Sequence, residues 1–245
     1  MRTAFITLLS TMLGVGAAFA GDDGACAVAQ NLVHADYALP QVASAIQEQH
    51  LEIAVVGTGS STLGGIDGQA KAYPARLEAA LVQKLPGVAV KILTYVKPRQ
   101  TAADMVGEFD RILADAKPAL IVWQTGTADA MRGVDPDEFK TALEEGVETL
   151  RAKHTDILFV NMQYSPRTET MIAVTPYADV MRVVAQHYDV PLFDRLGIMR
   201  HWSETGAFDF YAPGRDNVLA QRVHDCIARA IAALVINAGR LQAGQ

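Results

Sequence analysis

Short apolar runs alternate with segments of helical periodicity along this chain, and this alternation constrains the fold more than any other feature. Short continuous apolar runs are typical of strands buried on both faces of a parallel sheet. We predict strands at Glu52–Val56, Val88–Val96, Ala119–Gln124, Asp156–Asn161 and Val190–Phe193. We predict helices at Leu39–Gln49, Tyr73–Leu85, Thr101–Ala116, Asp135–Lys153, Thr175–Tyr188, Arg195–Ser203 and Asp216–Ala238.

Strands and helices that alternate in this way predict a three-layer α/β/α domain with a mostly parallel five-stranded sheet. Right-handed crossovers favour the flavodoxin-like strand order 2-1-3-4-5. Of the 245 residues, 50% are hydrophobic, which is enough for one sizeable core. We assign that domain to residues 39–238, with a leader segment at 21–38 and an exposed tail at 239–245.

The first twenty residues have the features of a secretory signal peptide. Arg2 supplies the positive start, an apolar stretch follows, and Ala18-Phe19-Ala20 fits the small-x-small cleavage rule. The apolar stretch is too short for a membrane span. We therefore predict a periplasmic or secreted protein with no stable membrane span after cleavage.

Cys26 and Cys226 are the two cysteines of the sequence. In an exported chain two cysteines favour one disulfide, which would join the mature N-terminus to the last helix. The alternative is a pair of free thiols.

The charge pattern excludes several classes of function. The formal net charge is −6 and no basic tract is present, so we expect neither nucleic-acid binding nor docking on an anionic membrane. No HExxH, CxxC or carboxylate cluster with metal-ligand spacing occurs. We therefore expect no metal and no other cofactor.

The loop after the first predicted strand is the main candidate for a functional site. Gly57, Gly59, Gly64 and Gly65 let the backbone approach a ligand closely, and the hydroxyls at 60–62 are potential nucleophiles or hydrogen-bond partners. The alternative is a tight turn whose polar residues have no role in binding or catalysis. In open α/β sheets ligands bind at the carboxyl ends of the strands, where the loops 97–101, 125–133, 162–167 and 194–201 should converge with this one.

The residues in these loops resemble the SGNH/GDSL hydrolase superfamily, in the branch of exported bacterial proteins. The resemblance extends over about residues 50–235. It implies that Ser60 is the nucleophile, that Gly59 and Thr62 flank it within the first block, and that Gly126 and Thr127 bind substrate. The matching segments are Gly59–Gly64, Gly126–Asp129, Gln163–Arg167, Leu192–Arg195 and Met199–Trp202.

Several positions depart from the pattern of this superfamily. Gly59 replaces the aspartate before the serine, Arg99 aligns with a glycine of the oxyanion hole, and Ala128 replaces an asparagine that donates to the oxyanion. The Asp-x-x-His block before the last helix has Ala212 in place of its histidine. A serine without an adjacent base is a weak nucleophile.

We considered which other residues could take over the lost roles. His201 follows the last strand on the same edge of the sheet and is our candidate for a replacement base. His224 is expected on the surface of the last helix, and Asp129 is expected to bond to loop backbone. Arg99 either lines the pocket and favours an anionic ligand, or turns outward and pairs with Asp104.

Three functions are compatible with this sequence. The first is an exported esterase or acyl hydrolase in which Ser60 attacks an ester bond. The second is a catalytically degenerate SGNH domain that binds a small-molecule or saccharide ester, an acyl group or a protein partner. The third is a structural envelope protein.

Overall fold

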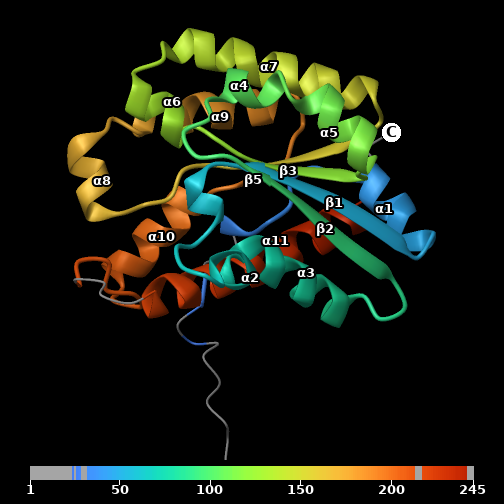
Figure 1. The fold of residues 1–245 in the computed structure, drawn as a ribbon, viewed down its shortest axis with the longest axis horizontal. Helices are drawn as coiled ribbons and strands as arrows, with labels where there is room; N and C mark the ends of the chain where they lie inside the picture. Colours follow the sequence, from blue (N-terminus) through green and yellow to red (C-terminus); the bar gives the residue numbers. More distant parts are fainter. Residues whose placement is uncertain (1–23, 25, 29–31, 213–216, 242–245) are drawn as a thin grey trace, which may run out of the picture.

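The computed structural model describes residues 24, 26–28, 32–212 and 217–241 (Figure 1). Its centre is a five-stranded sheet in the order β2-β1-β3-β4-β5, with every neighbouring pair parallel. The predicted sheet and its strand order are therefore confirmed. The strands are β1 (His50–Gly57), β2 (Ala89–Val96), β3 (Leu120–Gln124), β4 (Asp156–Val160) and β5 (Leu192–Phe193).

Helices cover both faces of the sheet, as the strand-helix alternation predicts (Figure 1). One face is covered by α1 (Pro40–Gln47), α3 (Tyr73–Lys84) and α11 (Val218–Arg240). The other face is covered by α4 (Ala102–Val106), α5 (Phe109–Ala116), α7 (Pro136–Ala152) and α9 (Thr175–His187). The remaining helices lie at the carboxyl ends of the strands: α2 (Gly68–Lys71), α6 (Thr127–Arg132), α8 (Pro166–Met171) and α10 (Arg195–Glu204).

The middle strand β3 is buried along its whole length. The ring of Trp123 packs against Phe109 at a centroid distance of 4.9 Å and against Phe159 at 5.4 Å. A Cβ atom at Gly146 would lie 2.4 Å from the same indole ring, so glycine at this position lets α7 pack closely on the sheet. Trp123 is therefore a core residue, as its position in an apolar run predicts.

Some predicted elements differ from the structure. The helix predicted at Thr101–Ala116 is two helices, because α4 ends with Gly107 as its C-cap residue and α5 begins at Phe109. Helices α6 and α8 form inside predicted loops. At α8, Ser165 caps the first turn by accepting a hydrogen bond from Thr168 N–H, a local signal that a search for apolar periodicity misses.

A disulfide joins Cys26 to Cys226, with a Cα–Cα distance of 5.2 Å. The predicted pairing is confirmed, and it fixes the N-terminal segment to α11. The indole N–H of Trp202 also donates to the carbonyl of Ala27 at 3.0 Å, which holds the same segment from a second side. The predicted signal peptide, Met1–Ala20, lies outside the described residues.

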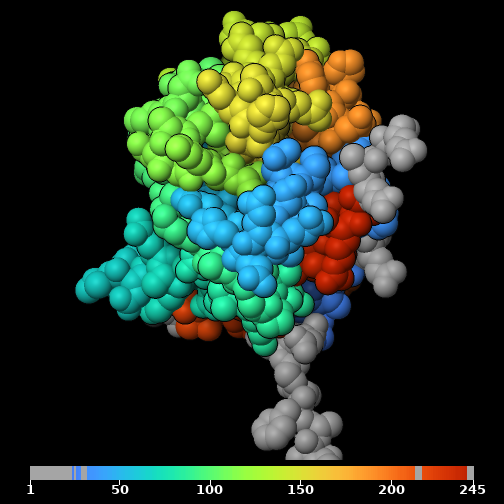
Figure 2. Space-filling view, turned by 90° about the vertical axis from the view of Figure 1, so that its right-hand side faces the viewer, coloured from blue at the N-terminus to red at the C-terminus, as the bar shows by residue number. Residues whose placement is uncertain are grey.

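The helices α1 and α11 meet at the edge of the sheet where the strands begin. Figure 2 faces this edge and shows α1, in blue, beside the end of α11, in red. The amide of Leu39 donates to the carbonyl of Ala238 at 3.1 Å. None of the helices in the described part of the chain has the length and apolar character that crossing a membrane requires.

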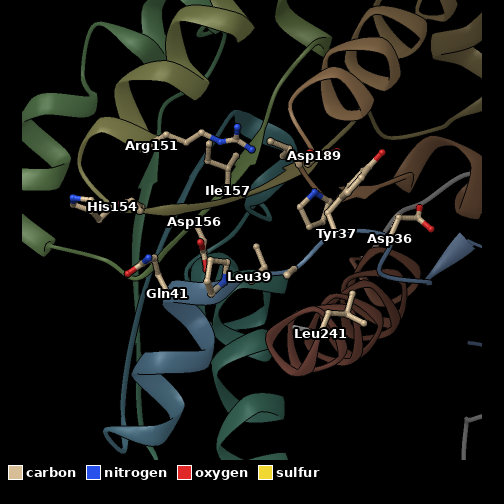
Figure 3. A pocket seen from close by; sticks show the side chains of 15 residues that line it. Asp36, Tyr37, Leu39, Gln41, Arg151, His154, Asp156, Ile157, Asp189 and Leu241 are labelled. Atoms are coloured by element: carbon tan, nitrogen blue, oxygen red, sulfur yellow. The ribbon is translucent and has the colours of Figure 1, made fainter. Parts of the chain in front are cut away.

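The N-terminus of α1 is capped by a residue from another element. No side chain at its own N-cap position accepts a hydrogen bond. Instead, Asp156 at the start of β4 accepts from Val42 N–H at 2.9 Å and points toward the first turn of α1 (Figure 3). Burial raises the pKa of Asp156 to about 6, against the opposing effect of its backbone hydrogen bonds.

This raised pKa predicts a pH-dependent stability. Between about pH 4 and pH 6 the folded protein holds a proton on Asp156 that the unfolded chain releases, so this group stabilises the fold increasingly as the pH falls from 7. Asp156→Asn keeps an oxygen acceptor for Val42 N–H but does not titrate. Lowering the pH from 7.5 to 5 should stabilise the wild-type protein by about 1–2 kcal/mol more than it stabilises this variant. Thermal unfolding at both pH values measures it, and an identical pH dependence in the two proteins would contradict it.

Candidate functional site

A cavity of about 770 Å³ lies at the carboxyl edge of the sheet. In Figure 1 this edge faces α6, α8 and α10 on the left. Segments that follow four strands converge there, as the topology requires. The cavity is lined by Thr58, Gly59, Ser60, Pro98, Arg99, Thr127, Ala128, Met131, Arg132 and Gln163.

Four of the predicted site residues thus share one cavity: Gly59, Ser60, Arg99 and Thr127. Gly126 is not part of the lining. It is the N-cap residue of α6 with φ 95°, and a Cβ atom there would lie 2.5 Å from the sulfur of Met162. Gly126 therefore shapes the backbone behind the cavity.

The two adjacent serines face different surroundings. Ser60 lies in a short 3-10 helix after β1 (η3, Gly59–Ser61) and borders the cavity. Ser61 is buried, and its hydroxyl lies 3.1 Å from the hydroxyl of Tyr73. Of these two neighbours, Ser60 is the one that a ligand in the cavity can reach.

Gln124, the last residue of β3, holds the loop after β1 in place. Its side-chain oxygen is within hydrogen-bond distance of four donors: Thr58 N–H (3.1 Å), Thr58 Oγ1 (3.1 Å), Ser60 Oγ (3.0 Å) and Ser61 Oγ (2.9 Å). A carbonyl oxygen has two lone pairs. The Thr58 amide uses one of them, so the three hydroxyls share the other. From the sequence, Gln124 was expected only as the end of a strand. A polar residue that ends a fully apolar strand is the signal that points to it.

Arg195, the first residue of α10, is the cation nearest to Ser60. It is 1% exposed, and its Nη1 lies 3.1 Å from the carbonyl oxygen and 3.5 Å from the hydroxyl oxygen of Ser60. Its Nη2 lies 3.4 Å from the side-chain oxygen of Gln163. Burial lowers the pKa of Arg195 to about 10, so the guanidinium stays charged at neutral pH. The positive charge expected at the site was that of Arg99, and Arg195 was not predicted to have a role.

Arg99 lines the cavity in a left-handed backbone conformation, with φ 65°. Glycine adopts this conformation most easily, which is consistent with the alignment of Arg99 to a glycine. The alternative ion pair between Arg99 and Asp104 is not formed. Asp104 instead pairs with Arg132 at 3.1 Å and caps α4 together with Thr101, and these contacts lower the pKa of its carboxyl.

His201 is not brought to Ser60. It follows Arg195 by six residues on α10, which places it about 9 Å further along the helix and on a different side. It is half-buried, outside the lining of the cavity. In the described part of the chain Ser60 has side-chain hydrogen bonds with Thr58, Gln124 and Arg195 alone.

His224 is buried, contrary to the predicted surface position, because it lies on the face of α11 that packs on α3. Its Nδ1 accepts the backbone N–H of Tyr73 at 2.9 Å, which places the proton of the neutral ring on Nε2. Burial and the nearby cations Arg195 and Arg76 lower its pKa to about 3. His224 is therefore a neutral structural residue whose accepting nitrogen is already occupied.

Asp129 bonds to loop backbone as predicted. Its Oδ1 accepts from Ala102 N–H at 2.9 Å, and burial raises the pKa of its carboxyl. Within the described residues, no group of three or more histidine, cysteine, aspartate or glutamate side chains is placed to hold a metal ion.

A parallel sheet in this order, with Ser60 presented at the carboxyl end of its first strand, is the arrangement expected of an SGNH/GDSL-type hydrolase. More narrowly, the chain belongs to the non-GDSL lipase-like family, whose model matches residues 25–241. No curated protein sequence matches the chain significantly.

Solved structures share this fold, and two of the following three are named as a hydrolase or an esterase. LAE5, a hydrolase from the metagenome of Lake Arreo, Spain, covers 76% of this chain and 95% of its own at 19% identity and a TM-score of 0.61. Axe2, an acetylxylan esterase from Geobacillus stearothermophilus, covers 76% and 94% at 17% identity and a TM-score of 0.61. TesA covers 75% and 99% at 21% identity and a TM-score of 0.58.

Proposed function

We propose that this protein is a degenerate hydrolase that binds an ester or acyl ligand in the Ser60 cavity without efficient turnover. One observation carries the proposal: among the described residues, no hydrogen-bond partner of Ser60 can act as a general base by accepting its proton. Gln124 offers an amide oxygen and Arg195 a permanent cation, and neither takes a proton at neutral pH.

The expected loss of rate is large. A positioned general base contributes a factor of about 10² to 10⁴. A single oxyanion donor contributes about 10² to 10³. Ala128 replaces the donor asparagine, so the contribution of that oxyanion donor is lost, whereas Arg99 keeps the backbone N–H of the glycine that it replaces. The contribution of the base is lost as well, because neither Gln124 nor Arg195 can take the proton of Ser60.

We expect Ser60→Ala to leave the hydrolysis of p-nitrophenyl acetate unchanged, because the residual rate would come from background reaction at the protein surface. A fluorophosphonate probe, which labels activated serines, should not modify the wild-type protein. Ser61→Ala is the matched control, since it removes a neighbouring hydroxyl that faces away from the cavity.

A second candidate is a slow esterase, and the exposure of the Ser60 hydroxyl to the cavity beside a cation favours it. Turnover or labelling that disappears in Ser60→Ala and persists in Ser61→Ala would establish it. Saccharide esters are one ligand class to test, because acetylxylan is named as the substrate of the structural neighbour Axe2.

We also propose that the protein acts in the periplasm or outside the cell. The Cys26–Cys226 disulfide is typical of oxidising compartments, and the first twenty residues have the pattern of a signal peptide. Cell fractionation tests this location.

A further inference from the structure

The guanidinium of Arg195 is a buried cation without an anionic partner in the described part of the chain. Its hydrogen-bond partners are the oxygens of Ser60 and the amide oxygen of Gln163, all of which are neutral. Its Nε is buried and has no hydrogen-bond partner. Buried charges in proteins are normally paired, because removal from water is costly.

Two polar residues hold Arg195 in this position. Asp194 accepts the Gly197 N–H at 2.9 Å and caps α10, and Asn161 donates to Asp194 at 2.7 Å while accepting from Leu196 N–H at 2.9 Å. These bonds fix the backbone on both sides of Arg195. The charge is thus held beside Ser60 by a rigid helix start.

The cavity in front of Arg195 has the same sign of charge. Arg99 and Arg132 line it, and no acidic residue is among its lining residues in the described chain, although Arg132 pairs with Asp104 outside the lining. Arg195 is not itself a lining residue and lies behind Ser60 and Gln163, which are. The rest of the wall is partly apolar, with Pro98, Ala128 and Met131. The site therefore combines positive charge with an apolar surface in a protein whose formal net charge is −6.

Two further polar atoms around Ser60 are buried without hydrogen-bond partners in the described chain. They are Nε2 of Gln124, whose oxygen contacts Ser60, and Oγ1 of Thr127, which lines the same cavity. Unsatisfied buried groups are rare in folded proteins, and these two belong to residues that contact Ser60 or line its cavity.

We propose that Arg195 is the counter-charge for a ligand carboxylate that binds against Ser60 and Gln163, with the apolar part of the ligand on Pro98, Ala128 and Met131. The ligand class is a carboxylate joined to an acyl chain or similar apolar body. This inference rests on the proposed function, since it requires the Ser60 cavity to be the ligand site.

Hexanoate and hexanamide test the inference, because they have nearly the same shape and differ in charge. We expect the wild-type protein to bind hexanoate at least about tenfold more tightly than hexanamide, measured by calorimetry or NMR titration. Arg195→Met should remove this preference. Arg195→Lys should retain part of it, because the lysine is charged but lacks the planar fork.

Arg200→Met is the matched control. Arg200 is on the same helix, but it pairs with Glu169, which does not line the cavity, whereas Arg195 contacts the lining residues Ser60 and Gln163. The preference for hexanoate should therefore persist in this variant. Arg195→Met should also unfold at the same temperature as wild type or higher, because it removes an unpaired buried charge. A residue with a merely structural role would give a lower melting temperature and no selective effect on the anion.

Equal affinity of the wild-type protein for both ligands would overturn the inference and leave the Ser60 cavity as a binding site. Retention of the full preference in Arg195→Met would overturn it as well. If Arg195→Met does not fold, the ratio of the two affinities in the wild-type protein and in Arg195→Lys still tests the inference. The proposed function would be contradicted by a different result, namely hydrolysis that depends on Ser60.

Discussion

Replacing both cysteines, as Cys26→Ser with Cys226→Ser, should lower the free energy of unfolding by about 3–5 kcal/mol. The disulfide closes a loop with a sequence separation of 200 residues, so its loss greatly increases the freedom of the unfolded chain. In a domain of this size each kcal/mol corresponds to roughly 2–4 °C. We therefore expect the melting temperature to fall by about 10 °C, measured by thermal unfolding.

The reducing agent supplies the control for this prediction. Dithiothreitol should lower the melting temperature of the wild-type protein to that of the double variant, and should have no effect on the variant. The Trp202 bond to Ala27 remains in both cases, so the N-terminal segment keeps a second contact. A double variant that melts within about 2 °C of wild type would contradict the prediction.

The inner strands β1, β3 and β4 could be predicted from the sequence because they are largely buried on both faces. A strand such as β3, with every residue buried, must be a continuous apolar run, and few other structures give that pattern. The short helices α6 and α8 could not be predicted in the same way. They have fewer than two turns and are stabilised by caps and local contacts, so their apolar periodicity is too short to detect.

The cavity was predictable in outline because Ser60, Arg99 and Thr127 follow neighbouring strands. The residues that control Ser60 were harder to identify. Gln124 belongs to a strand and so does not stand out in a search of loops. Arg195 lies in the segment 194–201 expected at the site, but the sequence does not indicate that its side chain is buried beside Ser60. His224 was assigned to the surface because of the neighbouring Asp225, but the packing of α11 on α3 decides its burial.

Gln124→Met should destabilise the protein by about 2–4 kcal/mol, since the methionine removes the acceptor shared by four donors. The buried amide of Thr58 would then lack a partner, whereas Ser61 would keep its contact with Tyr73. Chemical denaturation measures this loss. A Gln124→Met variant as stable as wild type would show that the amide oxygen does not hold the loop.

Gln124→Glu is the matched variant, and we expect it to lose much less stability. Its carboxylate keeps the acceptor, removes the unpartnered Nε2 and lies near the guanidinium of Arg195, because both groups contact the same Ser60 hydroxyl. The new carboxylate would give Ser60 an adjacent proton acceptor and would neutralise the cation. We therefore expect this variant to hydrolyse p-nitrophenyl acetate about tenfold faster than wild type, and the increase to disappear when Ser60→Ala is added. The preference for hexanoate over hexanamide should fall in the same variant. Unchanged hexanoate preference with full stability would mean that the charge of Arg195 does not select the ligand.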